Sequence, residues 1–450
     1  MQVEPPRTAA EHASEQTALK LALTGLAAAS VEWYDFFLYG TAAALVFPTV
    51  FFPATLPPFI ALLASFSSFT VGFLARPLGS IFFGHLGDRA GRKVALTVAL
   101  LTMGVATTLI GCLPSYHAAG IFSPLALVLL RFAQGLSVGG QWGGAMLLAT
   151  ENAPQARRGL YGSIAQAGVP AGVVLANLAF LIANGTTSAG DFLAYGWRIP
   201  FLASLALLGL AFFIHFRVTE TLAFRRLQEA RPSPAERRSP VLQALRLYPR
   251  TILLAAGAFM ATNVAFYILI TYIVAYGTSA GGLHLPRSTL LGAVLVANGT
   301  MAPVLFLAGS LSDRYGRRRI FMTGVVLIGV FAFVLFPLID TRSFFWITVA
   351  MLVGQSIQAL TYGPLAALFA ELFATRVRYS AASVAYQLGA IAGGGFAPLI
   401  ATALYAGYHS NLPVSCYIAL VCVISLLCVR ALRETYPREL DQNASATTSE

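Results

Sequence analysis

Two acidic residues, Glu32 and Asp35, stand in a stretch from Leu21 to Phe52 that is otherwise nearly free of charge. They are three residues apart, about one helical turn, so a helix turns both carboxylates towards roughly the same side. A carboxylate in an apolar helix is costly unless it faces a partner or a hydrated path. Arg131 is the natural partner, because it begins another apolar stretch. Such a pairing would help both charges tolerate burial, and a proton or a substrate anion could then compete for one partner. For Glu32 two interpretations remain: its side chain faces a cavity inside the protein, or it anchors the helix at the membrane interface.

The elements that must hold these residues are long and apolar. Of 450 residues, 57% are hydrophobic and 10% are charged, whereas a soluble domain has about 25% charged residues. This composition excludes a soluble protein and indicates an all-α integral membrane protein, because stretches of about 20 apolar residues can cross a bilayer as helices. We predict twelve such spans, at 21–52, 57–83, 94–114, 122–148, 160–184, 197–216, 251–277, 289–310, 320–339, 344–370, 380–407 and 411–429.

The net charge of +11 is distributed according to this topology. Twelve spans place 24 of the 29 Lys and Arg residues on the side of the two termini, and only Arg198, Arg287 and Arg342 on the other side. The positive-inside rule then puts both termini in the cytoplasm. The basic residues therefore report membrane orientation, and they do not indicate a nucleic-acid partner.

The chain divides into two related halves. We predict an N-tail at 1–20, six helices at 21–216, a polar central loop at 217–250, six helices at 251–429 and a C-tail at 430–450, with the tails and the loop cytoplasmic. FGHLGDRAGRKVAL, from Phe83, and AGSLSDRYGRRRIF, from Ala308, share six residues at an offset of 225. Two parallel six-helix bundles suit a transporter that rocks around a central site.

The repeated phrase resembles the signature loop of the major facilitator superfamily. EWYDF at 32–36, RPLGSIFFGHLGDRAGRK at 76–93, RFAQGLSVGGQWGGA at 131–145 and YGWRIPF at 195–201 further resemble the metabolite:proton symporter family. That family includes carriers of shikimate, 2-oxoglutarate, citrate and proline or betaine. In related symporters an acid in the first span and an Arg in the fourth perform proton coupling, and Asp35 and Arg131 match those positions. One departure is Gln141, where most members have Glu, and Gln cannot carry a proton.

The repeated loops also predict a cytoplasmic gate. Acidic side chains at helix ends beside guanidinium groups form charge-assisted hydrogen bonds that can hold neighbouring helices together in one conformation. The predicted gate residues are Asp88, Arg89, Arg92, Glu151, Arg158, Asp313, Arg314, Arg317, Glu371 and Arg378.

Polar and aromatic residues inside the spans are candidates for a substrate cavity. Amides and hydroxyls in spans also bind neighbouring helices to one another, and aromatic residues also serve as packing, so each has a structural alternative. The candidates are Tyr39, Gln134, Gln141, Trp142, Gln166, Asn263, Tyr267, Gln358, Tyr362 and Gln387.

The sequence contains no P-loop, metal-spaced His/Cys set or nucleophile elbow, so we expect no enzyme, cofactor or metal. We expect a proton-coupled importer of a small organic acid in the cytoplasmic (inner) membrane of a prokaryote, and a hydroxylated or aromatic monocarboxylate is the first substrate to test. Its partners are the substrate, the proton and the lipid bilayer, and we expect a functional monomer. The alternatives are a compatible-solute symporter, an uncoupled facilitator or exporter, and a transporter-like sensor.

Overall fold

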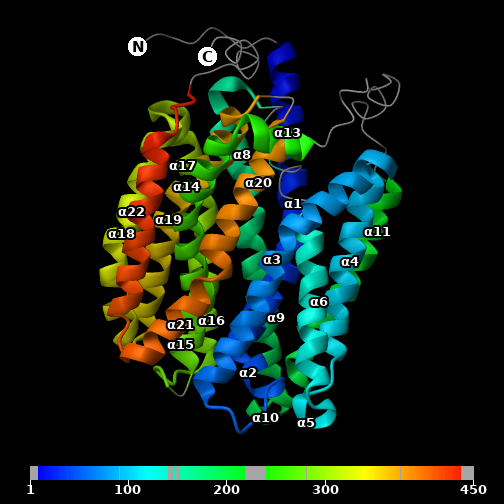
Figure 1. Cartoon of the computed structure of the whole chain (residues 1–450), viewed down its shortest axis with the longest axis vertical. Coiled ribbons are helices and arrows are strands. Elements are labelled where there is room, and N and C mark those ends of the chain that lie inside the picture. The colour runs from blue at the N-terminus through cyan, green and yellow to red at the C-terminus, as the bar shows by residue number, and fades with distance from the viewer. Residues whose placement is uncertain are drawn as a thin grey trace.

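The architecture was taken from a computed structural model, which describes residues 9–90, 92–139, 146, 149–150, 153–217, 240–279, 281–374 and 377–436. The regular elements in these ranges are all helices (Figure 1). The first half contains α1 (Ala9–Leu45), α2 (Phe47–Val50), α3 (Pro58–Ala90), α4 (Arg92–Cys112), α5 (Tyr116–Ala119), α6 (Phe122–Gly139), η1 (Gln155–Arg157), α8 (Arg158–Gln166), α9 (Gly168–Thr186), α10 (Ala189–Asp191), η2 (Phe192–Gly196) and α11 (Arg198–Arg217). The second half contains α13 (Pro240–Leu247), α14 (Pro249–Tyr267), η4 (Ile268–Tyr272), α15 (Ile273–Thr278), α16 (Arg287–Gly299), α17 (Met301–Tyr315), α18 (Arg317–Asp340), α19 (Phe344–Leu372), α20 (Arg378–Ala390), η5 (Ile391–Gly395), α21 (Ala397–Tyr408) and α22 (Leu412–Ala431).

The helices agree with the predicted spans. Nine helical stretches within the described ranges are long and apolar enough to cross a membrane. The other three predicted spans coincide with α1, α4 and α11. Helices are required here because a backbone in lipid must satisfy its own hydrogen bonds.

Several spans are interrupted, which the sequence did not predict. The helix that begins at Pro249 passes through the π-helical segment η4, and the helix that begins at Arg378 passes through η5. A π-helical turn inserts a residue into the helix and is frequent at functional sites. Both segments lie in the second half, on spans that face the first half. The outer boundaries also differ from prediction, since α1 begins within the predicted N-tail and α13 occupies part of the predicted central loop.

The two halves form separate groups of helices, as expected for two six-helix bundles (Figure 1). In the first half α3 packs on α6, and α1 packs on α9. The α3–α6 contact depends on glycine: a Cβ added at Gly139 would lie 1.9 Å from the Arg76 carbonyl oxygen. In the second half α18 packs on α19 and α22, and α14 packs on α20 and α22.

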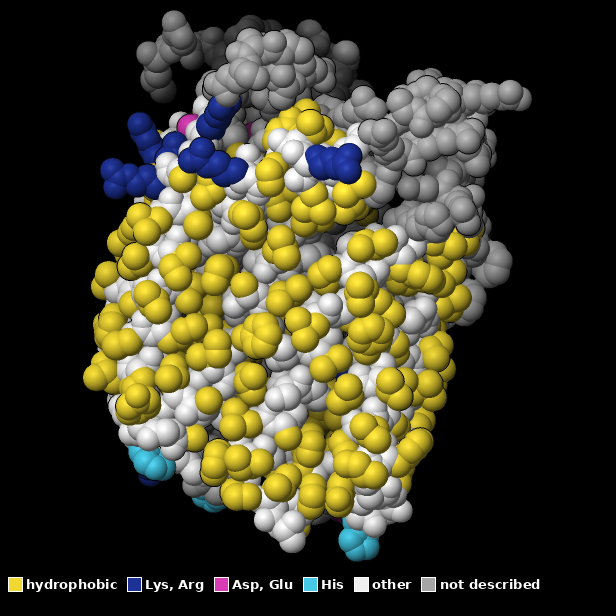
Figure 2. Space-filling model, viewed as in Figure 1, with side chains coloured by type: hydrophobic (Ala, Val, Ile, Leu, Met, Phe, Trp, Pro, Cys, Tyr) yellow, Lys and Arg dark blue, Asp and Glu magenta, His cyan; other side chains and the backbone are white. Residues whose placement is uncertain are grey.

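The surface shows which part of the protein lies in lipid. Hydrophobic side chains cover the middle of the face shown in Figure 2, and Lys and Arg gather at the end where α1 begins and α22 ends in Figure 1. We call this end the terminal end.

The two halves touch at both ends. At the terminal end a Cβ added to Gly159 of α8 would lie 2.5 Å from the Gly309 carbonyl oxygen of α17. At the opposite end the Arg287 guanidinium carbon lies 4.9 Å from the centre of the Phe192 ring. Between the ends, the Thr70 hydroxyl donates to the Gly395 carbonyl at 2.6 Å. This conformation is therefore closed on both sides.

Candidate functional site

A small cavity lies between the halves. Its volume is about 20 Å³, room for about one water molecule and far below the roughly 300 Å³ of a typical small-molecule pocket. A substrate therefore requires the halves to separate. The residues that line this central cavity are Trp33, Val169, Phe259, Thr262, Asn263, Phe266, Tyr267, Gln358, Tyr362 and Tyr386.

Four of the predicted cavity residues line it: Asn263, Tyr267, Gln358 and Tyr362. Two others lie at contacts between the halves. Gln166 donates its side-chain amide to the Tyr362 carbonyl, and the Gln387 amide donates to the Gly139 carbonyl at 3.4 Å. Amides that bridge the halves must exchange partners when the cavity opens.

Tyr39 and Gln134 lie elsewhere, inside the first half. The Tyr39 hydroxyl shares a hydrogen bond of 2.7 Å with Ser68, and the Gln134 amide donates to the Thr107 hydroxyl at 2.8 Å. Both are missing from the lining of the central cavity. In a helix that packs on neighbours all round, a polar side chain binds whichever helix it faces, and sequence spacing alone does not identify that helix.

Asp35 points into the first half, away from the central cavity. Its carboxylate accepts a hydrogen bond of 2.6 Å from the Ser204 hydroxyl of α11, and a second from Thr107 of α4. The carboxylate is 4% exposed, so these hydroxyls replace water around it.

Arg131 is not paired directly with Asp35 in this conformation, contrary to our expectation. Its guanidinium donates to the Gln134 side chain at 3.1 Å and lies 4.1–4.8 Å from the ring centres of Phe36, Tyr39 and Phe69. Cation–π contact of this kind stabilises a buried guanidinium.

The two predicted proton-site residues are joined indirectly. Because the Gln134 amide donates to the Thr107 hydroxyl, a chain of side chains runs from Arg131 through Gln134 and Thr107 to Asp35. Thr107 can donate either to Asp35 or to the Met103 carbonyl. A change of charge at Asp35 can thus reach Arg131 through three hydrogen bonds.

Arg76, in α3, is the main residue that our site prediction missed. It is 1% exposed, and its guanidinium carbon lies 4.1 Å from the Phe73 ring centre and 4.5 Å from that of Phe36. Glu32 attracts it electrostatically, and the Tyr267 hydroxyl is hydrogen-bonded to it. An Arg inside a predicted span was the available signal, because such charges mark functional positions.

Trp33 and Tyr386 also line the cavity without having been predicted. Trp33 directly follows Glu32, so the acidic residue within an apolar stretch could also have drawn attention to Trp33. Tyr386 precedes the predicted Gln387 and was one of 17 tyrosines, with no neighbouring charge to distinguish it.

A charged cluster connects the halves at the terminal end, where a gate was predicted. We name it the gate cluster: Asp313, Arg317 and Glu371. Arg317 is fully buried and forms ion pairs with Asp313 and, at 3.1 Å, with Glu371. The Asp313 carboxylate also accepts from the backbone N–H groups of Gly159, at 2.9 Å, and of Leu160, at 3.0 Å. These groups begin α8, so a carboxylate of the second half sits at a helix N-terminus of the first.

The other predicted gate residues are placed as follows. Arg158 is electrostatically coupled to Glu371 and Asp313, and Arg378 donates to the Phe373 carbonyl at 3.2 Å. Arg314 is exposed to solvent. Gln141, Trp142 and Glu151, and the side chains of Asp88, Arg89 and Arg92, lie outside the described residues.

Residues of the predicted C-tail contact the gate cluster. The Glu434 carboxylate accepts from the backbone N–H groups of Arg317 and Arg318, at 3.1 and 3.3 Å, and so caps α18. The Thr435 hydroxyl donates to Glu371 at 2.6 Å. These contacts were not predicted, because a lone Glu outside the spans belongs to no periodic pattern.

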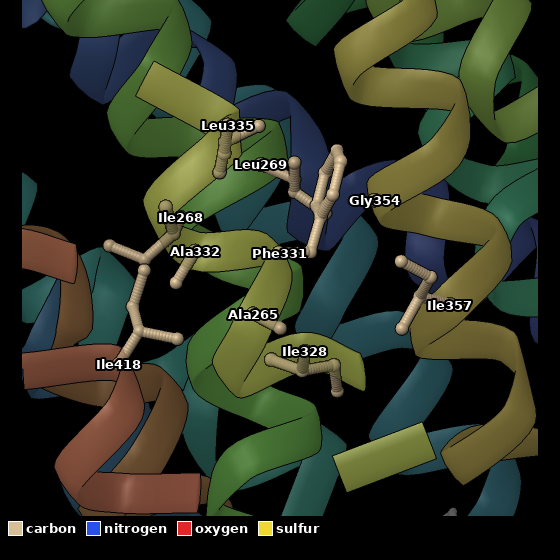
Figure 3. A pocket seen from close by; sticks show the side chains of 10 residues that line it. All are labelled: Ala265, Ile268, Leu269, Ile328, Phe331, Ala332, Leu335, Gly354, Ile357 and Ile418. Atoms are coloured by element: carbon tan, nitrogen blue, oxygen red, sulfur yellow. The ribbon is translucent and has the colours of Figure 1, made fainter. Parts of the chain in front are cut away.

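A second pocket lies within the second half (Figure 3). Its lining is apolar: Ala265, Ile268, Leu269, Ile328, Phe331, Ala332, Leu335, Gly354, Ile357 and Ile418. The side chains in Figure 3 carry no polar atom, so this pocket cannot orient a charged metabolite.

Comparison with known proteins agrees with this geometry. The family model of the Major Facilitator Superfamily matches residues 36–384 and, in a second match, 283–449. The inner membrane metabolite transport protein YhjE of Escherichia coli K12 is 39% identical, over 96% of this chain and 99% of its own. The shikimate transporter of the same organism is 37% identical, over 93% and 95%. The proline/betaine transporter of that organism is 32% identical, over 91% and 82%.

Solved structures show the same fold. The crystal structure of a D-xylose-proton symporter superposes with a TM-score of 0.71 at 20% identity, over 94% of this chain and 99% of its own. The relatives are consistent with the metabolite:proton symporter family that the sequence phrases resemble. The chain belongs to the major facilitator superfamily, and it is a multi-pass membrane transporter of metabolites.

Proposed function

We propose that the protein is a proton-coupled symporter that imports a small organic acid by alternating access. The observation that carries this proposal is a set of four ionisable residues in the first half, behind the residues that line the central cavity: Glu32, Asp35, Arg76 and Arg131. Two acids and two arginines balance in charge when the cavity is empty. A bound carboxylate then adds one negative charge in an apolar surrounding, which one proton neutralises.

In this proposal Asp35 carries the proton, and its charge reaches Arg131 through Thr107 and Gln134. The gate cluster closes one side, and its contacts with α8 must break for that side to open. The two halves, at 21–216 and 251–429, rock around the cavity. The remaining predicted polar residues, Gln166 and Gln387 among them, contribute through their contacts between the halves.

We assign the terminal end to the cytoplasm, because 24 of the 29 basic residues belong to that side. The membrane is then the cytoplasmic membrane, and the gate cluster is a cytoplasmic gate. We take the monomer as the functional unit, because the cavity and the gate cluster are both formed by residues of one chain.

Uptake into proteoliposomes tests the proposal. The reconstituted full chain is given labelled shikimate or betaine, compounds named for two of its relatives, and other small carboxylates, with and without an inward proton gradient. We expect a carboxylate to accumulate only with the gradient, and a protonophore to abolish this accumulation. Uptake that equilibrates but never exceeds the outside concentration would contradict proton coupling. Absence of any counterflow would contradict transport.

A compatible-solute symporter is the second candidate, and the aromatic lining favours it. Trp33, Tyr267, Tyr362 and Tyr386 line the cavity together with Phe259. Aromatic faces bind quaternary ammonium groups through cation–π contact. Accumulation of betaine without any carboxylate would establish this candidate in place of the first.

A further inference from the structure

Arg76 has hydrogen-bonding capacity that the closed conformation leaves unused. Its Nε and Nη2 atoms are buried and have no hydrogen-bond partner among the described residues. A buried guanidinium normally has its donors satisfied, because an unpaired donor in an apolar interior is destabilising. Such a group is available to a ligand.

Arg76 is also next to the central cavity. The Tyr267 hydroxyl is hydrogen-bonded to it, and its guanidinium carbon lies 5.7 Å from the Trp33 ring centre. Both Tyr267 and Trp33 line the cavity, from opposite halves of the protein. Arg76 is therefore placed where a substrate between the halves can reach it.

The charged and titratable groups around Arg76 come from four neighbouring helices. Glu32 on α1 attracts it, and one turn later on the same helix Phe36 lies under its guanidinium. Arg131 on α6 repels it, and Tyr267 on α14 and Tyr386 on α20 present phenols. Glu32 is thus the acidic group among these neighbours, and it is only half buried.

We propose that Arg76 anchors the carboxylate of the transported substrate, and that Glu32 is the internal counter-ion which the substrate replaces. This inference rests on the proposed function and adds a substrate contact to it. Arg76 presents a planar fork that binds a carboxylate through two parallel hydrogen bonds. Tyr267 lies beside the fork and donates its hydroxyl to the same carboxylate.

The closed conformation explains why Glu32 is needed. A lone guanidinium in an apolar interior is costly, so the empty transporter holds Arg76 with an acid of its own. A substrate carboxylate then competes with Glu32 for one cation. Removing Arg76 and removing the charge of Glu32 must consequently change carboxylate affinity in opposite directions.

Binding to the detergent-purified full chain at one fixed pH tests this. The probe is whichever compound, from a panel of small mono-, hydroxy- and dicarboxylates that includes shikimate, binds most tightly by isothermal titration. Arg76→Gln is expected to weaken binding about 100-fold, since a hydrogen-bonded charge contributes about 1.5–3 kcal/mol and 1.4 kcal/mol is tenfold. Glu32→Gln is expected to tighten binding several-fold. Tyr267→Phe keeps the ring that packs on Phe37, Phe69 and Phe73 and is expected to weaken binding a few-fold.

Arg342→Gln is the matched control, because it removes an exposed arginine at the opposite end and should leave affinity unchanged. If Arg76→Gln fails to fold, the opposite signs of Glu32→Gln and Tyr267→Phe still decide the matter. Unchanged affinity in a folded Arg76→Gln protein, or weaker binding in Glu32→Gln, would overturn the anchor while the proposed function stands. A wild-type protein that binds no carboxylate would overturn both.

Discussion

The two halves of the protein face the central cavity with different chemistry. The first half lines it with Trp33 and Val169 and holds four ionisable residues behind them, Glu32, Asp35, Arg76 and Arg131. The second half contributes neutral groups, Asn263, Gln358 and three tyrosines among them. Charge that can be gained or lost is therefore placed on one side, and hydrogen-bonding and stacking groups on the other. In the proposed function, the first half therefore couples transport to protons and the second half selects the shape of the substrate.

The largest expected effect comes from removing the proton site. If one proton accompanies each substrate, two pH units sustain an accumulation of about 100-fold, since each pH unit supplies about 1.4 kcal/mol, a factor of ten in the concentration ratio. Asp35→Asn should reduce this ratio to about one and retain counterflow, because binding and rocking do not require the proton. The ratio of internal to external label measures it. Full accumulation by Asp35→Asn would contradict the assignment of proton coupling to this residue of the first half.

A smaller effect on uptake is expected from a substitution that crowds the Arg131 guanidinium in the first half. A Cβ at Gly72 would lie 2.5 Å from the Arg131 Nε atom. Gly72→Ala should therefore displace the guanidinium, destabilise the protein by about 1–3 kcal/mol and slow uptake. Gly292→Ala in α16 is the control, because its Cβ would meet the Phe344 ring at 3.5 Å, an ordinary contact. Melting temperature and initial uptake rate should fall in the first variant only.

A substitution among the uncharged cavity residues of the second half should change KM and leave the accumulation ratio unaffected. Gln358→Ala removes an amide that lines the cavity, and KM should rise about threefold to tenfold, the value of one hydrogen bond. The accumulation ratio at saturating substrate should stay that of the wild type, because no charge has changed. A reduced ratio would show that the second half also takes part in coupling.

The smallest effect is expected from breaking the series of hydrogen bonds that connects Asp35 to Arg131. Thr107→Val keeps the shape of the side chain but removes the hydroxyl that Gln134 and Asp35 share. Proton-driven uptake should fall about twofold to fivefold, which corresponds to about 0.5–1 kcal/mol. Thr102→Val on the same helix is the control, since its hydroxyl donates to the Val98 carbonyl. Equal rates in both variants would mean that Asp35 and Arg131 act independently.

The spans and the family could be predicted from sequence because membrane length and a repeated loop leave strong local patterns. The interruptions at Ile268–Tyr272 and Ile391–Gly395 could not, since an inserted residue in a helix does not change its apolar composition. Asp35 and Arg131 were identified as charges in apolar stretches. Their indirect connection depends on Thr107 and Gln134, and only the packing of α4 against α6 brings these together.

Arg76 illustrates a second reason why a site residue can be missed by prediction from sequence. It falls within the predicted span at 57–83, but it stands in the phrase that leads to the signature loop and was assigned no role. Its importance comes from Tyr267, which is distant in the chain and belongs to the other half. Contacts between the halves leave no periodic pattern in either, so residues that meet there are the hardest to predict.

The contact of Glu434 and Thr435 with α18 and α19 has a practical consequence for the handling of this protein. Trimming the chain after Ala431, or fusing a tag there, would leave the first N–H groups of α18 without their carboxylate and Glu371 without its hydroxyl partner. Such a protein should melt at a lower temperature in detergent, because a lost helix cap costs about 1 kcal/mol. A reporter joined beyond Tyr436 keeps these hydrogen bonds, so purification tags belong after that residue.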